Sequence, residues 1–222
     1  MSLHLLPVAP KPALIIVDMQ NDFVRQGAPF EVPGGRETIA PQQSLLKYFR
    51  ENGYPVIFLQ WVSVANDPWR RLESKFTWTE FLDENTKACR VGHFRSYEDS
   101  SEPVDCAAII DELAPIAGEP IVPKHGFGGF YGTNLHDILS ASGVDTLVFT
   151  GVVAECCVED SVRQAYYHHY ASIVVSDAVE SMSATRKVEC LAVLDENYGW
   201  VADSASVIAH LTMQNQQASV NA

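Results

Sequence analysis

The sequence predicts an α/β fold, in which helices cover both faces of a doubly wound, mostly parallel sheet of about six strands, as in a Rossmann-like three-layer sandwich. Two observations predict it. Short apolar segments alternate along the chain with longer segments of helical spacing. The apolar segments carry no polar residue at alternate positions, which is typical of strands buried on both faces. The 222 residues contain neither an internal repeat nor a linker, so we expect a single domain over residues 1–222.

The expected strands and helices follow one another in βαβ order. The strands are Ala13–Val17, Val56–Gln60, Pro120–Pro123, Thr146–Thr150 and Ser172–Val175, with a last one at Val201. The helices are Ser44–Glu51, Cys106–Leu113, Asn134–Ala141, Glu155–Tyr170, Thr185–Glu196 and Ser204–Thr212. Right-handed crossovers then bring the carboxyl ends of all strands to one edge of the sheet, where ligands bind in open α/β folds.

Two segments depart from this regular pattern. Residues 61–100 are rich in Trp, Phe, Asp and Arg and are longer than a plain connection, so they indicate a helical lid or an oligomer contact. Residues 214–222 are small and polar, which predicts a flexible tail.

The net charge restricts the partners. Lys and Arg number 15 against 28 Asp and Glu, which gives −13 at pH 7. A surface this acidic repels phosphate backbones and anionic lipids, so we expect neither nucleic acid nor membrane as a partner. The N-terminus has no basic segment before its apolar stretch and therefore does not resemble a signal peptide, so a cytoplasmic location is expected.

The cysteines allow two interpretations. There are five of them, at positions 89, 106, 156, 157 and 190. The number is odd and no CxxC occurs, which argues against a disulfide scaffold and against a zinc site. Either all five are reduced, buried thiols, or one of them performs chemistry.

Three reactive groups fall at the carboxyl ends of expected strands. Asp18 ends ALIIV, Lys124 follows PIVP, and Cys156-Cys157 opens the helix after TLVFT. A helix N-terminus lowers the pKa of a thiol and stabilises an oxyanion, so an acid, an amine and an activated thiol are expected to meet there. Each residue also has an ordinary structural interpretation, as a turn aspartate, a solvated lysine or a small buried thiol. The neighbouring loop, KHGFGGFYGTN, fits neither a dinucleotide fingerprint nor a P-loop.

Three segments resemble the signatures of the isochorismatase-like cysteine hydrolases. They are ALIIVDMQNDF (13–23), VPKHGFGGFYGTNL (122–135) and TGVVAECCVEDSVRQAY (150–166). The resemblance implies a catalytic triad of Asp18, Lys124 and Cys157. Cys157 is favoured over Cys156 because the family nucleophile directly precedes a Val in a G-x-x-x-x-x-C-V pattern. The resemblance further implies a cis peptide between Val153 and Ala154, and an oxyanion hole made by the backbone N–H groups of Ala154 and Cys157.

This resemblance implies a hydrolase that cleaves a C–N bond of a small amide, ureido or carbamoyl compound through a thioester, with release of ammonia or an amine. Nicotinamidases of the family bind a metal through histidines after the second strand. The corresponding segment, QWVSVANDPWRR (60–71), has none, so we expect no metal and no cofactor. True isochorismatases lack the cysteine, so Cys157 argues against cleavage of a vinyl ether.

Aromatic and polar residues near the strand ends are candidates for the substrate pocket. They are Phe23, Gln60, Trp61, Trp69, Phe130 and Tyr131, and packing in the core or between subunits is the alternative role. Three other functions stay open: a non-catalytic small-ligand-binding protein, an isochorismatase-type hydrolase of a non-amide substrate, and a thiol redox protein that uses Cys156 and Cys157. The resemblance also implies a homo-oligomer, either a dimer or a tetramer.

Overall fold

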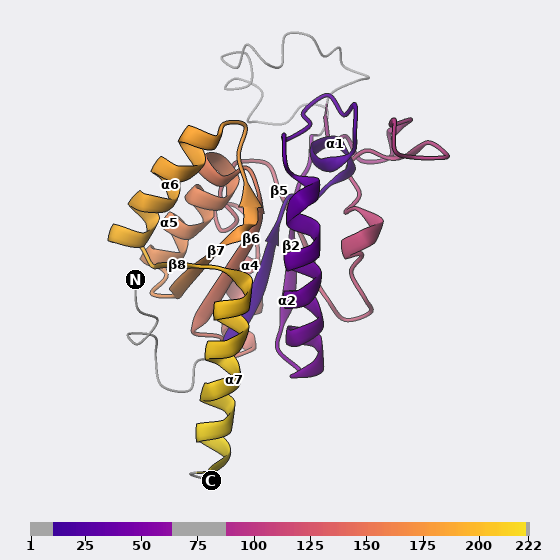
Figure 1. The fold of residues 1–222 in the computed structure, drawn as a ribbon. Coiled ribbons are helices and arrows are strands. Elements are labelled where there is room, and N and C mark those ends of the chain that lie inside the picture. Colours follow the sequence, from indigo (N-terminus) through magenta and orange to yellow (C-terminus); the bar gives the residue numbers. More distant parts are fainter. Residues whose placement is uncertain (1–10, 64–87, 221–222) are drawn as a thin grey trace.

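A parallel sheet organises the computed structural model, which describes residues 11–63 and 88–220 (Figure 1). Within them the main sheet has six strands in the order β5-β2-β1-β6-β7-β8, all paired in parallel. The strands are β1 (Pro12–Val17), β2 (Val56–Trp61), β5 (Ile121–Lys124), β6 (Thr146–Val152), β7 (Ala171–Glu180) and β8 (Trp200–Ala202). The predicted α/β fold and its six strands are confirmed.

Helices form the outer layers on both faces of this sheet. One face packs against α2 (Ile39–Glu51) and α7 (Ser204–Val220). The other packs against α4 (Leu135–Ala141), α5 (Glu159–Tyr167) and α6 (Ala184–Asn197) (Figure 1). Shorter elements complete the fold: helix α1 (Asn21–Val24), the 3₁₀ helices η2 (Arg36–Thr38) and η4 (Asp111–Leu113), and the π-helix η5 (Ala154–Val158). None of the described helices has the length and apolarity that crossing a membrane requires.

The central strand β1 shows why the sequence pattern has no polar positions. Leu14 and Ile16 point into the cluster beneath α2 and α7, whereas Ile15 and Val17 point into the cluster beneath α4, α5 and α6. All four side chains are fully buried. Each face of the strand is covered by a helical layer, so an apolar residue is favoured at every position.

The predicted helix over Cys106–Leu113 is wrong. The structure has instead a short antiparallel pair, β3 (Phe94–Arg95) with β4 (Val104–Asp105), and only the 3₁₀ turn η4. The backbone of this segment is bonded to the chain after β1. The N–H of Asn21 donates to Ala108 O at 3.0 Å, and the N–H of Ile110 donates to Met19 O at 3.0 Å. These tertiary bonds use backbone groups that a helix would need.

The C-terminal prediction is also wrong, since α7 continues to Val220 instead of ending at Thr212. The side chain of Asn215 explains part of this extension, because it accepts a hydrogen bond from the Tyr54 hydroxyl at 2.6 Å. Asn215 Nδ2 also donates to the hydroxyl of Tyr48 in α2 at 3.4 Å, so this part of α7 lies beside α2. The predicted lid or oligomer contact in residues 61–100 falls largely outside the described residues.

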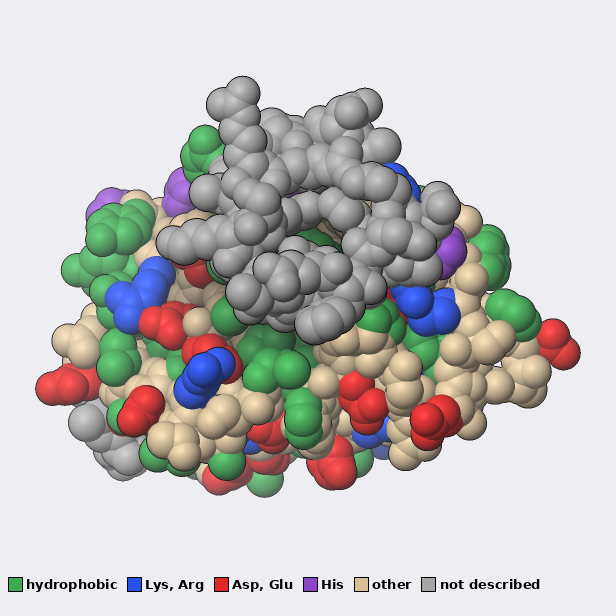
Figure 2. Space-filling view, turned by 90° about the horizontal axis from the view of Figure 1, so that it is seen from above, with side chains coloured by type: hydrophobic (Ala, Val, Ile, Leu, Met, Phe, Trp, Pro, Cys, Tyr) green, Lys and Arg blue, Asp and Glu red, His purple; other side chains and the backbone are tan. Residues whose placement is uncertain are grey.

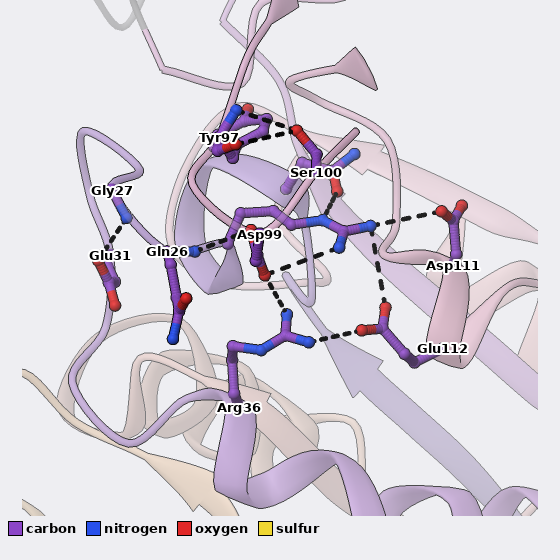
Figure 3. Close-up of polar contacts among 11 residues, drawn as sticks. Gln26, Gly27, Glu31, Arg36, Tyr97, Asp99, Ser100, Asp111 and Glu112 are labelled. Atoms are coloured by element: carbon purple, nitrogen blue, oxygen red, sulfur yellow. Dashed lines mark hydrogen bonds and ion pairs between the residues drawn. The ribbon is translucent and has the colours of Figure 1, made fainter. Parts of the chain in front are cut away.

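An ion-pair network connects Asp99 and η4 with η2 and with Arg25, which follows α1 (Figure 3). Asp99 Oδ2 lies 2.9 Å from Arg36 Nη1 and 3.7 Å from Arg25 Nη1. Arg36 Nη2 also pairs with Glu112 Oε1 at 2.7 Å, and Arg25 Nη2 with Asp111 Oδ2 at 3.3 Å. Arg25 and Arg36 therefore share three carboxylates, and the ion pairs hold these segments together.

Gly151 permits the close approach of β6 to β1. Its φ is +104°, and a Cβ built there would lie 2.0 Å from the carbonyl oxygen of Val17. This φ disfavours any residue with a Cβ, and the short distance to Val17 leaves no space for one.

We predict that Gly151→Ala lowers the free energy of unfolding by about 3–5 kcal/mol, through overpacking together with left-handed backbone strain. The matched control is Gly53→Ala, at φ +67° with no atom within 4 Å of the added Cβ. That variant should lose only about 1 kcal/mol, from the dihedral angle alone. Denaturant unfolding measures both, and equal losses would contradict the steric argument.

Candidate active site

Asp18 lies directly after β1 and is buried, with a left-handed φ of +51°. Its backbone N–H donates to Leu59 O of β2 at 3.1 Å, which continues the sheet pairing. Its Oδ1 accepts the backbone N–H of Trp61 at 3.0 Å. A non-glycine residue in this region is strained, and such strain clusters at functional sites. The carboxylate is therefore held rigidly at the carboxyl edge of the sheet.

Lys124 is the last residue of β5, two strands away from β1, and is also buried. Strands lie about 4.8 Å apart, so the side chain must cross β2 to reach the centre of the sheet. It does so, and Lys124 Nζ lies 2.8 Å from Asp18 Oδ2. The ammonium also donates to Gly126 O at 3.2 Å. The predicted acid and amine thus form a buried ion pair.

Cys157 lies in η5, which follows β6, and its side chain interacts with both Asp18 and Lys124. It is buried, with 6% of its surface exposed. Ser161 Oγ donates to Cys157 O at 2.6 Å and ties this turn to α5. The structure thereby brings the three predicted triad residues together from β1, β5 and the helix after β6.

The predicted cis peptide is displaced by one residue. The structure has it between Val152 and Val153, not between Val153 and Ala154. The strand itself runs to Val152, two residues beyond the predicted end at Thr150, and the cis bond follows directly after it. Ala154 and Cys157 both lie in η5, in which the N–H groups of Cys156 and Val158 donate to Val153 O at 3.1 and 3.2 Å.

The charge state of the thiol differs from the expectation. Burial raises the pKa of the Cys157 thiol well above its ordinary 9.0, the Asp18 carboxylate raises it further, and Lys124 lowers it without offsetting either effect. Burial also raises the pKa of Asp18, against the lowering influence of Lys124. Burial disfavours the ammonium of Lys124, but Asp18 outweighs that effect and leaves its pKa raised. These directions favour a protonated thiol at Cys157 beside the ion pair of Asp18 and Lys124.

A pocket of about 400 Å³ opens over these groups at the carboxyl edge of the sheet. Its described lining is mostly apolar and consists of Asp18, Phe23, Phe30, Trp61, Phe127, Val152, Val153, Glu155, Cys156, Cys157, Met182 and Arg186. Viewed onto this edge, hydrophobic side chains lie between acidic and basic ones around the described part of the face (Figure 2). The dimensions and the lining suit a small molecule with few polar groups.

Two of the predicted pocket residues, Phe23 and Trp61, line this pocket. Three others do not, and Trp69 lies outside the described residues. Gln60 donates to Ala107 O at 2.7 Å. Phe130 stacks on His168 with ring centroids 4.9 Å apart, within the core, and Tyr131 is 68% exposed at the surface. Proximity in sequence to a strand end did not predict where these side chains point.

Gln20 is a buried residue of the site that the sequence reasoning missed. Its Oε1 accepts the N–H of Trp61 at 2.9 Å, and its Nε2 donates to Trp61 O and Ala107 O, each at 2.8 Å. The side chain thus fixes the peptide that also donates to Asp18. Its place two residues after Asp18, at the same strand end, was an available signal.

The glycine-rich loop after Lys124 is held against α5. Gln164 Oε1 accepts the N–H groups of Phe130 and Tyr131 at 3.0 and 2.9 Å. A Cβ on Gly128 would lie 1.9 Å from Gln164 Nε2. The glycines therefore permit close contact between loop and helix, and this contact fixes the path of the chain beyond Lys124.

The remaining pocket residues follow the other strands. Met182 and Arg186 come after β7, and Glu155 and Cys156 precede Cys157 in η5.

All five cysteines are unpaired. Among the residues that the structure describes, no group of three or more His, Cys, Asp or Glu side chains is arranged to hold a metal ion.

Comparison with known proteins gives one consistent family. The isochorismatase domain matches residues 12–206. The chain is 31% identical to a ureidoacrylate amidohydrolase from Methylobacterium radiotolerans, over 90% of this chain and 80% of that protein.

Solved structures agree with this match. An isochorismatase-like hydrolase from Alkaliphilus metalliredigens is 27% identical, with a TM-score of 0.76 over 90% of this chain and 98% of that one. The N-carbamoylsarcosine amidase from Thermoplasma acidophilum is 31% identical, with a TM-score of 0.69 over 87% of this chain and 96% of that one.

We predict that the buried pair behaves as a coupled unit. Asp18→Asn and Lys124→Met each leave one uncompensated buried charge and should each lower the free energy of unfolding by about 3–5 kcal/mol. The double variant removes both charges and should lose less than the sum of the single variants. Denaturant unfolding of the four proteins measures this, and additive losses would show that the two groups do not interact.

Proposed function

Because this chain belongs to the isochorismatase family, we propose that it is a cysteine-dependent amidohydrolase that cleaves a C–N bond of a small ureido, carbamoyl or amide compound. The observation that carries the proposal is the contact of three chemically matched groups at the pocket. The Cys157 thiol interacts with the ion pair of Asp18 and Lys124, in which Lys124 Nζ lies 2.8 Å from Asp18 Oδ2. A nucleophile beside a base that is itself held by a third group is the usual arrangement for covalent catalysis.

The first half of the reaction forms a thioester. As the substrate carbonyl approaches Cys157, the thiol proton passes to the Asp18 carboxylate and the sulfur forms a bond with the carbonyl carbon. The tetrahedral intermediate collapses with cleavage of the C–N bond, and Asp18 returns the proton to the leaving nitrogen. Lys124 keeps its charge throughout and compensates for the charge on Asp18 whenever that group is ionised.

The second half releases the acid. Water attacks the thioester and gives its proton to Asp18, the C–S bond breaks, and the sulfur regains a proton from Asp18. In both tetrahedral intermediates the oxyanion would accept hydrogen bonds from two backbone N–H groups of η5, those of Ala154 and Cys157. The whole chain would form one catalytic domain, assembled as a dimer or a tetramer.

Two relatives support the substrate class. A ureidoacrylate amidohydrolase and an N-carbamoylsarcosine amidase are each 31% identical to this chain, and the names of both specify a ureido or carbamoyl substrate. The isochorismatase domain matches residues 12–206, a range that contains every described residue of the pocket. A C–N bond next to a carbonyl is the bond that an attacking thiol and a proton-donating Asp18 are suited to break.

We predict that Cys157→Ala lowers ammonia release from ureido and carbamoyl compounds by about a thousandfold or more, because no other group forms the thioester. Cys156→Ala is the matched control, since this neighbouring thiol also lines the pocket. It should retain activity close to that of the unsubstituted protein. Circular dichroism verifies that both variants fold. Substantial turnover by Cys157→Ala would contradict the proposal, and so would a complete loss in Cys156→Ala alone.

The pH profile provides a further prediction. Asp18 acts as a base only when ionised, and burial raises its pKa above the ordinary 3.8. Activity should therefore disappear as the pH falls through this raised pKa, so the acid limb of kcat/KM should lie above 3.8. Stopped assays across pH measure it, with unfolding followed at each pH as the control. An acid limb at or below the ordinary value would rule out a buried Asp18 as the base.

A further inference from the structure

We propose that Asp22 is a positioning residue of the pocket, which holds the aromatic part of the pocket wall in place without touching the substrate. This inference deepens the proposed function and rests on it where turnover is concerned. No step of the proposed reaction uses Asp22, although its side chain is fully buried and lies four residues after Asp18. A buried carboxylate is costly, so one that takes no part in the chemistry requires another explanation.

The carboxylate of Asp22 has partners on both oxygens. Oδ1 accepts the Tyr97 hydroxyl at 2.7 Å and lies 3.0 Å from Arg95 Nε. Oδ2 accepts the backbone N–H of Cys89 at 2.8 Å. The thiol of Cys106 also interacts with this side chain. The guanidinium of Arg95 compensates for the negative charge, and the neutral donors occupy further acceptor positions, as a buried carboxylate requires.

These partners belong to three separate stretches of the chain. Cys89 precedes β3, Arg95 and Tyr97 lie at the end of β3 and just after it, and Cys106 follows β4. The backbone N–H of Asp22 also donates to Cys106 O at 3.2 Å. The helix that carries Asp22, α1, has four residues and no side-chain cap, so it is too short to be stable by itself. Tertiary contacts must therefore orient α1, and those of Asp22 connect it to all three stretches.

The aromatic part of the pocket wall packs against the residues that Asp22 holds. This part of the wall consists of the rings of Phe23, Phe30 and Trp61. The centroid of Phe23 lies 6.3 Å from that of Phe30 and 6.1 Å from that of Trp61. The rings pack against a small buried cluster, which consists of Ala88, Cys89 and Ala107. Each member of this cluster is either bonded to Asp22 or adjoins a residue that interacts with it, so a loss of these contacts should loosen the wall.

The contacts of Asp22 also lie close to the reacting groups. Burial raises the pKa of the Cys89 thiol well above its ordinary 9.0, and the charges of Asp22 and Asp18 raise it further, whereas Lys124 lowers it. Cys89 is therefore a neutral thiol that lies within reach of both carboxylates and serves in packing. Trp61 belongs to the wall and also donates its backbone N–H to Asp18 at 3.0 Å. The wall that Asp22 supports is thus bonded directly to the base.

Alkylation of Cys157 with two reagents tests the inference without requiring turnover. Iodoacetamide and N-phenyliodoacetamide carry the same reactive group, and only the second has a ring that can pack on the aromatic wall. Each rate is divided by the rate with N-acetylcysteine, and the ratio of the two then cancels the thiolate fraction. In a Cys156→Ala background, we expect Asp22→Asn to lower this phenyl-to-plain ratio about fivefold, because the wall loses its support. Mass spectrometry assigns the modified cysteine.

Asp99→Asn is the matched control. It is the same substitution two residues after Tyr97, at a carboxylate that pairs with Arg36 at 2.9 Å (Figure 3). This variant should lower stability and leave the phenyl-to-plain ratio unchanged. Tyr97→Phe removes one donor from Asp22 but keeps the ring, and should lower the ratio about twofold. If Asp22→Asn does not fold, Tyr97→Phe decides the matter.

Three results would overturn the inference: an unchanged ratio in folded Asp22→Asn or in Tyr97→Phe, an equal fall in Asp99→Asn, or no preference for the phenyl reagent in the Cys156→Ala protein. With a substrate identified by ammonia release, Asp22→Asn should raise KM about tenfold and change kcat less than about twofold, and a fall in kcat alone would contradict a positioning role. Failure of the proposed function would instead appear as no ammonia release by protein with Cys157 intact. The alkylation ratio would still decide the role of Asp22.

Discussion

The buried ion pair between Asp18 and Lys124 is the interaction on which the site depends. The two residues lie at the ends of β1 and β5, with β2 between them, so the order β5-β2-β1 places both at the carboxyl edge of the sheet within reach of each other. Removing each charge from water costs several kcal/mol, which a salt bridge in the interior repays only with good geometry and further hydrogen bonds. The N–H of Trp61 and the carbonyl of Gly126 provide such bonds. Because the pair is costly as a stabilising device, its retention at the foot of a pocket is best explained by chemistry.

The pair also determines the state of the nucleophile. A thiol next to a lysine is usually activated as a thiolate. In this site Asp18 pairs with Lys124 and burial disfavours the charge on sulfur, so we infer that Cys157 is protonated at rest. Activation then requires the substrate, whose approach allows the proton to move to Asp18 while charge develops on an oxygen facing η5. The same carboxylate can return that proton to the leaving nitrogen, so one coupled unit serves both proton transfers.

The sequence predicted the sheet, and the meeting of Asp18, Lys124 and Cys157 at its edge, because both depend on local patterns. Uninterrupted apolar segments located the strands, and Asp18, Lys124 and Cys157 followed strand ends that a parallel sheet gathers at one edge. The helix expected at Cys106–Leu113 failed because tertiary bonds to Met19 and Asn21 override local propensity. The helix end expected at Thr212 was wrong because α7 continues to Val220, and within this extension Asn215 accepts a hydrogen bond from Tyr54. The pocket wall was only partly predictable, since Phe130 and Tyr131 follow Lys124 in sequence but turn toward α5 under the control of Gln164. The low thiol pKa expected at a helix start did not take burial into account, and burial together with the Asp18 carboxylate raises the pKa of Cys157.

The central claim is that Asp18, Lys124 and Cys157 form one electrostatic unit with a protonated thiol at rest. The most direct measurement is the pKa of Cys157, obtained from its alkylation rate against pH with mass-spectrometric assignment of the modified cysteine. The account predicts a pKa above the ordinary 9.0 in the unsubstituted protein. It predicts a lower pKa in Asp18→Asn, where a negative neighbour is lost and Lys124 is left uncompensated. A Cys157 that is already a thiolate at neutral pH, or a pKa that does not fall in Asp18→Asn, would contradict it.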